Sequence, residues 1–254
     1  MLIYHYTSQQ SALQILESQS FWFTNVGHLN DSLEHKWYFK RALDLNEQNP
    51  IKWVNAEIAR RNRHKDHLVK LDYMRTDDHY PDEASIFIAS FSSVDDQLSQ
   101  WIQYADKGMG VSLGFDEDAI KNWTNTIPRS VNRAELVNYV IEKTDQIIKS
   151  STEYSGLEGV FHKTNSWATE KEFRIALGGV PYYDYQFRTA NATLVSYVSR
   201  PLLNFWDVIQ EVRLGPLVSP QSYFSWSTLL SKYCQGNYHE KIKLMKSEIS
   251  LRIN

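Results

Sequence analysis

The residues best suited to chemistry are two glutamates, Glu170 and Glu172, and the arginine that follows them, Arg174. Two carboxyl groups on one face of a strand repel each other, which raises the pKa of one of them, as acid/base catalysis needs. The same spacing also fits a solvated strand face on which Glu172 and Arg174 each find an ionic partner. The spacing alone leaves both interpretations open.

A predicted strand that begins near Lys171 has to position these side chains. Charged and apolar residues alternate from there to Leu177, which is the period of a strand with one buried face. The pair Gly178-Gly179 then favours a turn, because residues without a Cβ atom adopt turn conformations easily. We therefore expect Glu172 and Arg174 to share one face of this strand.

Hydroxyl, imidazole and aromatic side chains in other elements offer further candidates. Ser90 and Ser92 share one strand face at period two. Trp101 and Tyr104 are i, i+3 on a helix predicted to start at Asp95 or Asp96, so they form either a core pair or a platform for a planar ring. His5 follows an apolar start and either binds a ligand or is a satisfied, partly buried polar group.

The composition is that of an ordinary soluble globular protein, with 42% hydrophobic and 22% charged residues in 254. The net charge of −3 argues against a protein with a positively charged surface overall, so any contact with nucleic acid would need a local basic patch. A single cysteine, Cys234, excludes an intrachain disulfide and fits a reducing compartment. No apolar run approaches the ~20 residues of a membrane-spanning helix, and the first residues do not form a secretory signal. We therefore expect a cytoplasmic protein without a membrane partner.

One run of the chain, residues 60–67, is strongly basic. It contains Arg60, Arg61, Arg63 and Lys65. This run fits either a solvated helix face or a contact with nucleic acid. His64 and His67 in the same run are helical neighbours, but no Cys or third His stands at a supporting spacing, so we expect no metal site.

The predicted elements alternate irregularly, which indicates an α+β fold with a mixed central sheet of short strands. The expected strands are Leu2–Tyr6, Phe21–Thr24, Ile86–Ser93, Val111–Phe115, Val195–Val198, Val208–Leu214 and Ile242–Met245. Two long helices are expected at Ile51–Tyr73 and Arg133–Ser150. We predict one domain over 1–254, with a helical insertion at about 31–83. Gly108 and Gly110 precede a strand, the reverse of the order in the dinucleotide fingerprint, so they do not form a Rossmann loop.

Several short motifs occur together in this chain. They are Tyr4-His5-Tyr6-Thr7, Asn30-Asp31 with Glu34, Ser90-Phe91-Ser92, Trp101 with Tyr104, the segment from Gly110 to Phe115, and Trp167 with Glu170 to Arg174. In their types and order they resemble a large bacterial family of unknown function, often found among phage-defence and mobile-element genes. That resemblance implies a role in defence, with an antitoxin or a defence-system protein as partner.

A second resemblance implies an activity. ADP-ribosyltransferases, including the toxins that modify DNA or RNA, carry a first-strand His or Arg, a Ser-x-Ser element and a late Glu-x-Glu. The corresponding residues are His5, then Ser90 and Ser92, then Glu170 and Glu172. The resemblance implies a mixed central sheet with helical insertions, NAD as the substrate, and a nucleic acid or protein as acceptor.

The same resemblance implies roles for individual residues. Glu172 would be catalytic, while Glu170 would help to select or activate the acceptor. His5 and Thr7 would hold the ribose or the nicotinamide amide. His5 would also take part in catalysis, and Ser90 and Ser92 would bind NAD. The remaining expected binding residues are Tyr6 and Tyr104 on the nicotinamide ring, Trp101 as a platform, and Lys163 and Arg174 on the pyrophosphate.

Two other classes of function compete with this one. A metal-independent nuclease or phosphotransferase would use His5 as acid/base, and Lys163 and Arg174 on phosphate. A non-catalytic module that senses a nucleotide would need only an aromatic pocket around Trp101, Tyr104 and Trp167.

Overall fold

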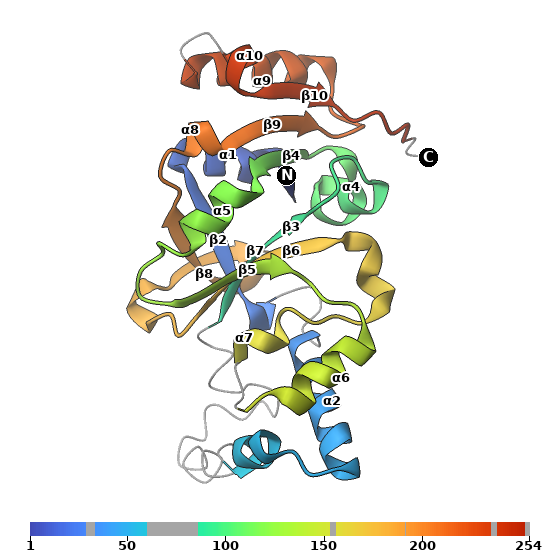
Figure 1. Cartoon of the computed structure of the whole chain (residues 1–254). Helices are drawn as coiled ribbons and strands as arrows, with labels where there is room; N and C mark the ends of the chain where they lie inside the picture. Colours follow the sequence, from blue (N-terminus) through green and yellow to red (C-terminus); the bar gives the residue numbers. More distant parts are fainter. Residues whose placement is uncertain (29–33, 60–85, 153–155, 191, 235–237, 252–254) are drawn as a thin grey trace.

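The computed structural model describes six stretches of the chain, residues 1–28, 34–59, 86–152, 156–190, 192–234 and 238–251 (Figure 1). Within them the protein is a mixed α/β structure, with helices around a central mixed sheet, as the sequence predicts. The basic residues Arg60, Arg61, Arg63 and Lys65 lie outside these stretches, as does most of the helix predicted from Ile51 to Tyr73. Residues 52–59 of that helix are described and are helical.

Strand β3 (Phe87–Ser92) lies at the centre of the sheet, with partners on both of its edges. Strand β6 (Glu172–Gly178) runs antiparallel along the whole of one edge. Two strands share the other edge: β1 (Leu2–Thr7) pairs at the C-terminal end of β3, and β2 (Ser20–Asn25) pairs at its N-terminal end. The sheet therefore forks at β3, with β1 and β2 as the two branches.

Each branch of the fork continues into further strands. The β1 branch adds β4 (Val111–Asp116), β9 (Ile209–Leu214) and β10 (Lys243–Lys246), and the β2 branch adds β8 (Thr193–Pro201) and β7 (Gln186–Ala190). Strand β5 (Val131–Leu136) pairs with the remaining edge of β6. Among the described strands only the β9–β10 pair is parallel, so the sheet is mixed.

Helices connect these strands and cover the sheet. They are α1 (Gln9–Ser18), α2 (Glu34–Gln48), α4 (Leu98–Tyr104), α5 (Glu117–Thr124), α6 (Ile141–Ser150), α7 (Gly156–Gly159), α8 (Phe205–Val208), α9 (Pro220–Tyr233) and α10 (Tyr238–Lys241). The described stretches also contain the 3-10 turns η1 (Val26–His28), η3 (Asp106–Gly108), η4 (Asn165–Glu170) and η5 (Tyr182–Asp184). Figure 1 shows α2, α6 and α7 together at one end of the molecule, and α9 and α10 at the other.

Hydroxyl and carboxylate caps fix the start of three helices. The side chains of Ser8, Asp116 and Ser219 each accept a hydrogen bond from a backbone N–H in the first turn of α1, α5 and α9. The predicted cap at Asp95 or Asp96 is wrong. Helix α4 starts at Leu98, and Asp96 accepts instead from the Trp101 indole at 2.6 Å.

Aromatic rings from several strands form the main core. The ring of Phe21 lies 5.4 Å from Phe91 and 4.9 Å from Phe115, both in edge-on contact. All three side chains are buried, and α1 adds Ile15 and Leu16 to the same core. Each such side chain contributes about 1.5–3 kcal/mol through burial, so this core holds β1, β2, β3 and β4 together.

The predicted long helix from Arg133 to Ser150 is wrong in its first half. Residues Val131–Leu136 form β5, which pairs antiparallel with β6, and α6 begins only at Ile141. Asn138 separates the two, because its side chain accepts from the backbone N–H of Val140 in a turn. Pairing with a distant strand therefore overrides a helix-like stripe of apolar residues.

No helix in the described stretches has the length and apolar character needed to cross a membrane.

Candidate functional site

A cavity of about 620 Å³ lies at the fork, where β1 and β2 separate along β3. Its volume is within the range of about 300–1,000 Å³ that is common for ligand pockets. Of the residues proposed from the sequence, those that line it are His5, Tyr6, Ser90, Ser92, Tyr104, Lys163, Trp167, Glu170, Glu172 and Arg174. The fold therefore brings together side chains from opposite ends of the chain.

Two of the proposed binding residues do not line the cavity. Trp101 is fully buried, and its ring lies 4.9 Å from that of Tyr6. It is therefore a core residue, the first of the two interpretations given above, and not a platform for a ligand ring. Thr7 ends β1 opposite Val111. The residues on α4 that line the cavity are Gln100 and Tyr104.

Two carboxylates and two cations form a buried cluster in the cavity wall. The ammonium of Lys163 lies 2.8 Å from Glu170 Oε2 and 2.9 Å from Glu172 Oε2, so it bridges the two acids. Arg174 contacts Glu172 through Nε at 2.5 Å and through a terminal nitrogen at 3.0 Å. All four residues are at least 94% buried. The Glu172/Arg174 face of β6 is therefore ion-paired within the protein and is not a solvated strand face.

Glu172 has its acceptor positions filled by protein donors. Arg174 supplies two hydrogen bonds, Lys163 a third and the Ser90 hydroxyl a fourth, and a carboxylate has about four lone-pair sites. Burial alone raises the pKa of this carboxyl. The charges of Arg174 and Lys163 and these hydrogen bonds outweigh burial and lower the pKa to about 2. Glu172 is therefore ionised at neutral pH.

Glu170 is less fully engaged by its neighbours. Its Oε1 accepts from the Tyr104 hydroxyl at 2.6 Å and its Oε2 from Lys163 at 2.8 Å. Each oxygen thus has one partner among the described residues and retains a lone pair. Because Glu170 lines the cavity, its carboxylate is a candidate acceptor for a ligand.

A single left-handed residue orients the two glutamates. The 3-10 turn η4 ends at Glu170, and β6 starts at Glu172. Between them Lys171 has φ +43°, a conformation that reverses the chain within one residue. Its backbone carbonyl accepts from the N–H of Ser93, which fixes this turn against β3. The strand thus does not extend back to Glu170, and the acids meet through Lys163 instead.

His5 reaches the cavity from the core side of β1. Its Nδ1 lies 2.9 Å from the carbonyl oxygen of Ser90, and its ring lies 5.5 Å from that of Phe91. Burial lowers the pKa of this imidazole below its ordinary value, so His5 is neutral at pH 7. A carbonyl only accepts hydrogen bonds, so Nδ1 carries the proton and Nε2 is left as an acceptor.

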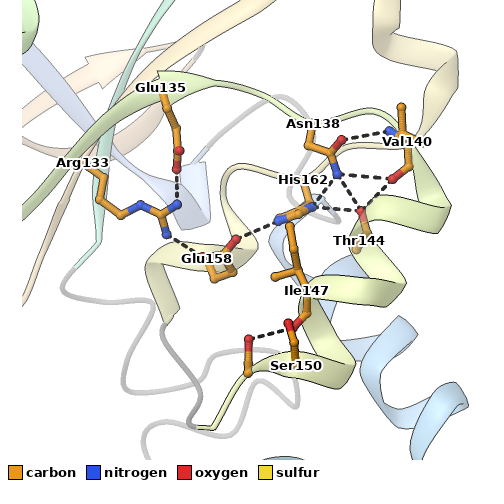
Figure 2. Close-up of polar contacts among 10 residues, drawn as sticks. Arg133, Glu135, Asn138, Val140, Thr144, Ile147, Ser150, Glu158 and His162 are labelled. Atoms are coloured by element: carbon orange, nitrogen blue, oxygen red, sulfur yellow. Dashed lines mark hydrogen bonds and ion pairs between the residues drawn. The ribbon is translucent and has the colours of Figure 1, made fainter.

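A second polar network joins Arg133, Asn138, Thr144, Glu158 and His162 (Figure 2). Its centre is His162, which is 2% exposed and contacts Glu158 through Nε2 at 2.9 Å and Thr144 through Nδ1 at 2.9 Å. The bond from His162 is the main cause that lowers the pKa of Glu158 to about 2, and Arg133 adds a second bond.

This network holds the backbone that carries Lys163. The N–H of Lys163 donates to the carbonyl of Asn138 at 3.0 Å, and the Asn138 side chain contacts His162 at 3.1 Å. Arg174 also donates to the carbonyl of Val160 at 2.6 Å. The segment from Glu158 to Lys163 is thus tied both to α6 and to β6, which positions the bridging ammonium.

Residues 100–175 match the model of a family described as a protein of unknown function, DUF2971. No curated protein and no solved structure matches the chain. The matched segment contains Tyr104, Lys163, Glu170, Glu172 and Arg174, so it covers the buried cluster. The resemblance to a domain of unknown function is confirmed for this segment. The link with phage defence and the resemblance to ADP-ribosyltransferases stay predictions.

The sequence did not point to four residues in the opposite wall of the cavity. These are Trp22 and Thr24 on β2, His28 in η1, and Arg188 on β7. The spacing of Trp22 and Thr24 predicts that both side chains lie on one face of β2. The residues around them do not indicate that this face lines a cavity together with β6. Among the described residues, no group of three or more His, Cys, Asp or Glu is placed to hold a metal ion.

Proposed function

We propose that the protein binds NAD in the cavity at the fork and cleaves its nicotinamide–ribose bond, as an ADP-ribosyltransferase-like enzyme. The observation that carries the proposal is the convergence of His5, Ser90, Glu170 and Glu172 on one cavity. These residues come from β1, β3, η4 and β6, and the resemblance pairs them in the same order.

The side chains suit the chemistry of this bond. When the bond between ribose C1′ and the nicotinamide nitrogen breaks, its electron pair leaves with nicotinamide and positive charge develops on the ribose. An acceptor oxygen then bonds to C1′ and loses its proton. Carboxylates beside that carbon stabilise the charge, and they do so mainly in the transition state.

The two glutamates fit different parts of this task. The resemblance assigns catalysis to Glu172, which is held ionised beside the cavity. The hydrogen bonds favour Glu170 as the carboxylate that receives a ribose hydroxyl, because its oxygens retain lone pairs. His5 Nε2 is a further acceptor at the cavity for a hydroxyl or an amide. Tyr104 adds an aromatic ring to the same wall.

Release of nicotinamide from NAD tests the proposal directly. The purified protein is incubated with NAD alone, and with protein or nucleic acid as acceptor, and free nicotinamide is measured by chromatography. We expect Glu170→Gln or Glu172→Gln to lower the rate by about 100-fold or more, the usual cost of losing a group that stabilises transition-state charge.

Glu211→Gln is the matched control. Glu211 is also a buried strand glutamate paired with an arginine two residues later, Arg213, but it does not line the cavity. The Glu211→Gln variant should lose stability, as Glu172→Gln does, but it should still release nicotinamide at the rate of the wild type. A wild-type protein that neither binds NAD nor releases nicotinamide refutes the proposal, and binding without release favours a nucleotide-sensing module. Full activity in both glutamine variants refutes the assignment of the carboxylates.

A further inference from the structure

Arg188 lies in the cavity wall opposite the buried cluster. It sits on β7, opposite Val195 of β8, and lines the cavity with Trp22 and Thr24. Its guanidinium carbon is 5.5 Å from the centroid of the Trp22 ring and 5.9 Å from that of Tyr197. Two aromatic faces therefore hold the guanidinium in one orientation.

The guanidinium has an incomplete set of partners. One terminal nitrogen donates to the Thr24 hydroxyl at 3.3 Å. Its Nε is buried and finds no acceptor in the described stretches, nor does any carboxylate there form an ion pair with Arg188. A buried donor without an acceptor is disfavoured, so this arrangement is suited to an anion that supplies the missing acceptors.

The charge of the cavity wall points the same way. The charged lining residues are Glu170 and Glu172, Lys163 and Arg174, and Arg188. The first four neutralise one another within hydrogen-bond distance. Among the described lining residues, Arg188 is thus the positive charge left over, on the far side of the cavity from the glutamates.

We propose that Arg188, oriented by Trp22 and assisted by Thr24, is the anion subsite of the cavity and binds the phosphates of a nucleoside diphosphate. A guanidinium offers paired donors that match phosphate oxygens, and aromatic rings beside it keep it in place. The choice of a nucleoside diphosphate rests on the proposed function, whereas an anion at Arg188 follows from the contacts alone. This subsite takes the pyrophosphate role that the resemblance to ADP-ribosyltransferases implies for Lys163 and Arg174, whose charges the two glutamates balance.

Binding of four small probes tests the subsite without any turnover. Calorimetry measures the affinity of the full chain for ADP-ribose, ADP, pyrophosphate and adenosine. The variant is Arg188→Gln, and the charge-matched control is Arg129→Gln, because Arg129 is exposed and lies outside the cavity lining. We expect Arg188→Gln to bind ADP and ADP-ribose about tenfold more weakly or worse, the loss of one charge-assisted contact. Its affinity for adenosine should stay that of the wild type, and Arg129→Gln should bind all four probes as the wild type does.

The outcomes separate this inference from the proposed function. A wild type that binds ADP through Arg188 but releases no nicotinamide from NAD supports the subsite and refutes the enzyme. Equal loss of ADP and adenosine affinity in Arg188→Gln overturns the subsite, because the residue would then act on the shape of the cavity. Failure of the wild type to bind ADP and pyrophosphate also overturns it.

Discussion

Replacing Glu172 by glutamine should lower the stability of the protein by an amount that depends on pH. The pKa of Glu172 is about 2 in the folded protein, against an ordinary value of 4.5. One pKa unit is worth about 1.4 kcal/mol, so the ionised carboxylate contributes about 3 kcal/mol to folding. Breaking a buried ion pair by removing one partner costs a similar amount, about 3–5 kcal/mol.

The direction of this pH dependence follows from the lowered pKa of Glu172. A carboxyl that is more acidic in the folded protein stabilises it fully above about pH 5 and loses this contribution as the pH falls from 4.5 towards 2. At pH 3 roughly 2 of the 3 kcal/mol are gone by the same relation. The stability gap between wild type and Glu172→Gln should therefore be about 3 kcal/mol at pH 7 and about 1 kcal/mol at pH 3.

Urea denaturation followed by tryptophan fluorescence at pH 7, 5, 4 and 3 measures this gap. Arg174→Met and the double variant Glu172→Gln/Arg174→Met complete the cycle at pH 7. The double variant should lose less stability than the sum of the losses in the two single variants. The reason is that the charge of Arg174 is the largest of the contributions that lower the pKa of Glu172. A gap that stays constant between pH 7 and pH 3, or losses that simply add, would refute the ion-pair account.

Two further predictions concern the stability of the protein. His162→Phe keeps a ring beside Tyr38 but removes the hydrogen bond to Glu158. The variant should lose about 1–3 kcal/mol of folding stability at pH 7. It should also lose less stability than the wild type as the pH falls from 4.5 to 2, because the pKa of Glu158 is then lowered less; urea denaturation measures both effects. Gly110→Ala should cost about 1–3 kcal/mol, since its Cβ would lie 2.3 Å from the backbone oxygen of Thr7. Gly114→Ala should cost less in the same assay, because its Cβ meets only side-chain atoms, at 3.0 Å; an equal loss in both would contradict this explanation.

Much of the local structure could be predicted from the sequence, because it depends on near neighbours. The alternation after Lys171 and the two glycines at its end locate β6 correctly. The shared face of Glu172 and Arg174 also follows from a period of two. What surrounds that face could not be predicted, since Lys163 reaches it through a segment anchored on α6.

The other failures have the same physical origin. Leu136 and Val137 fit a helical stripe, but the pairing of β5 with β6 decides the conformation of Val131–Leu136. Arg188 shows no local signal, since its importance depends on β7 lying beside β8 and on β8 lying beside β2. Contacts between distant segments determine both the wall of the cavity and its charge balance.

The position of β1 has a consequence for the way the chain is made. Its ladder partners in β3 and β4 lie about a hundred residues further along, at Ser92 and at Val111–Asp116. Ribosomes add about 5–20 residues per second. Several seconds therefore pass between the synthesis of β1 and the synthesis of its partner strands β3 and β4. We expect nascent chains arrested before Asp116 to be captured by chaperones and cut readily by proteases, and full-length chains to resist both.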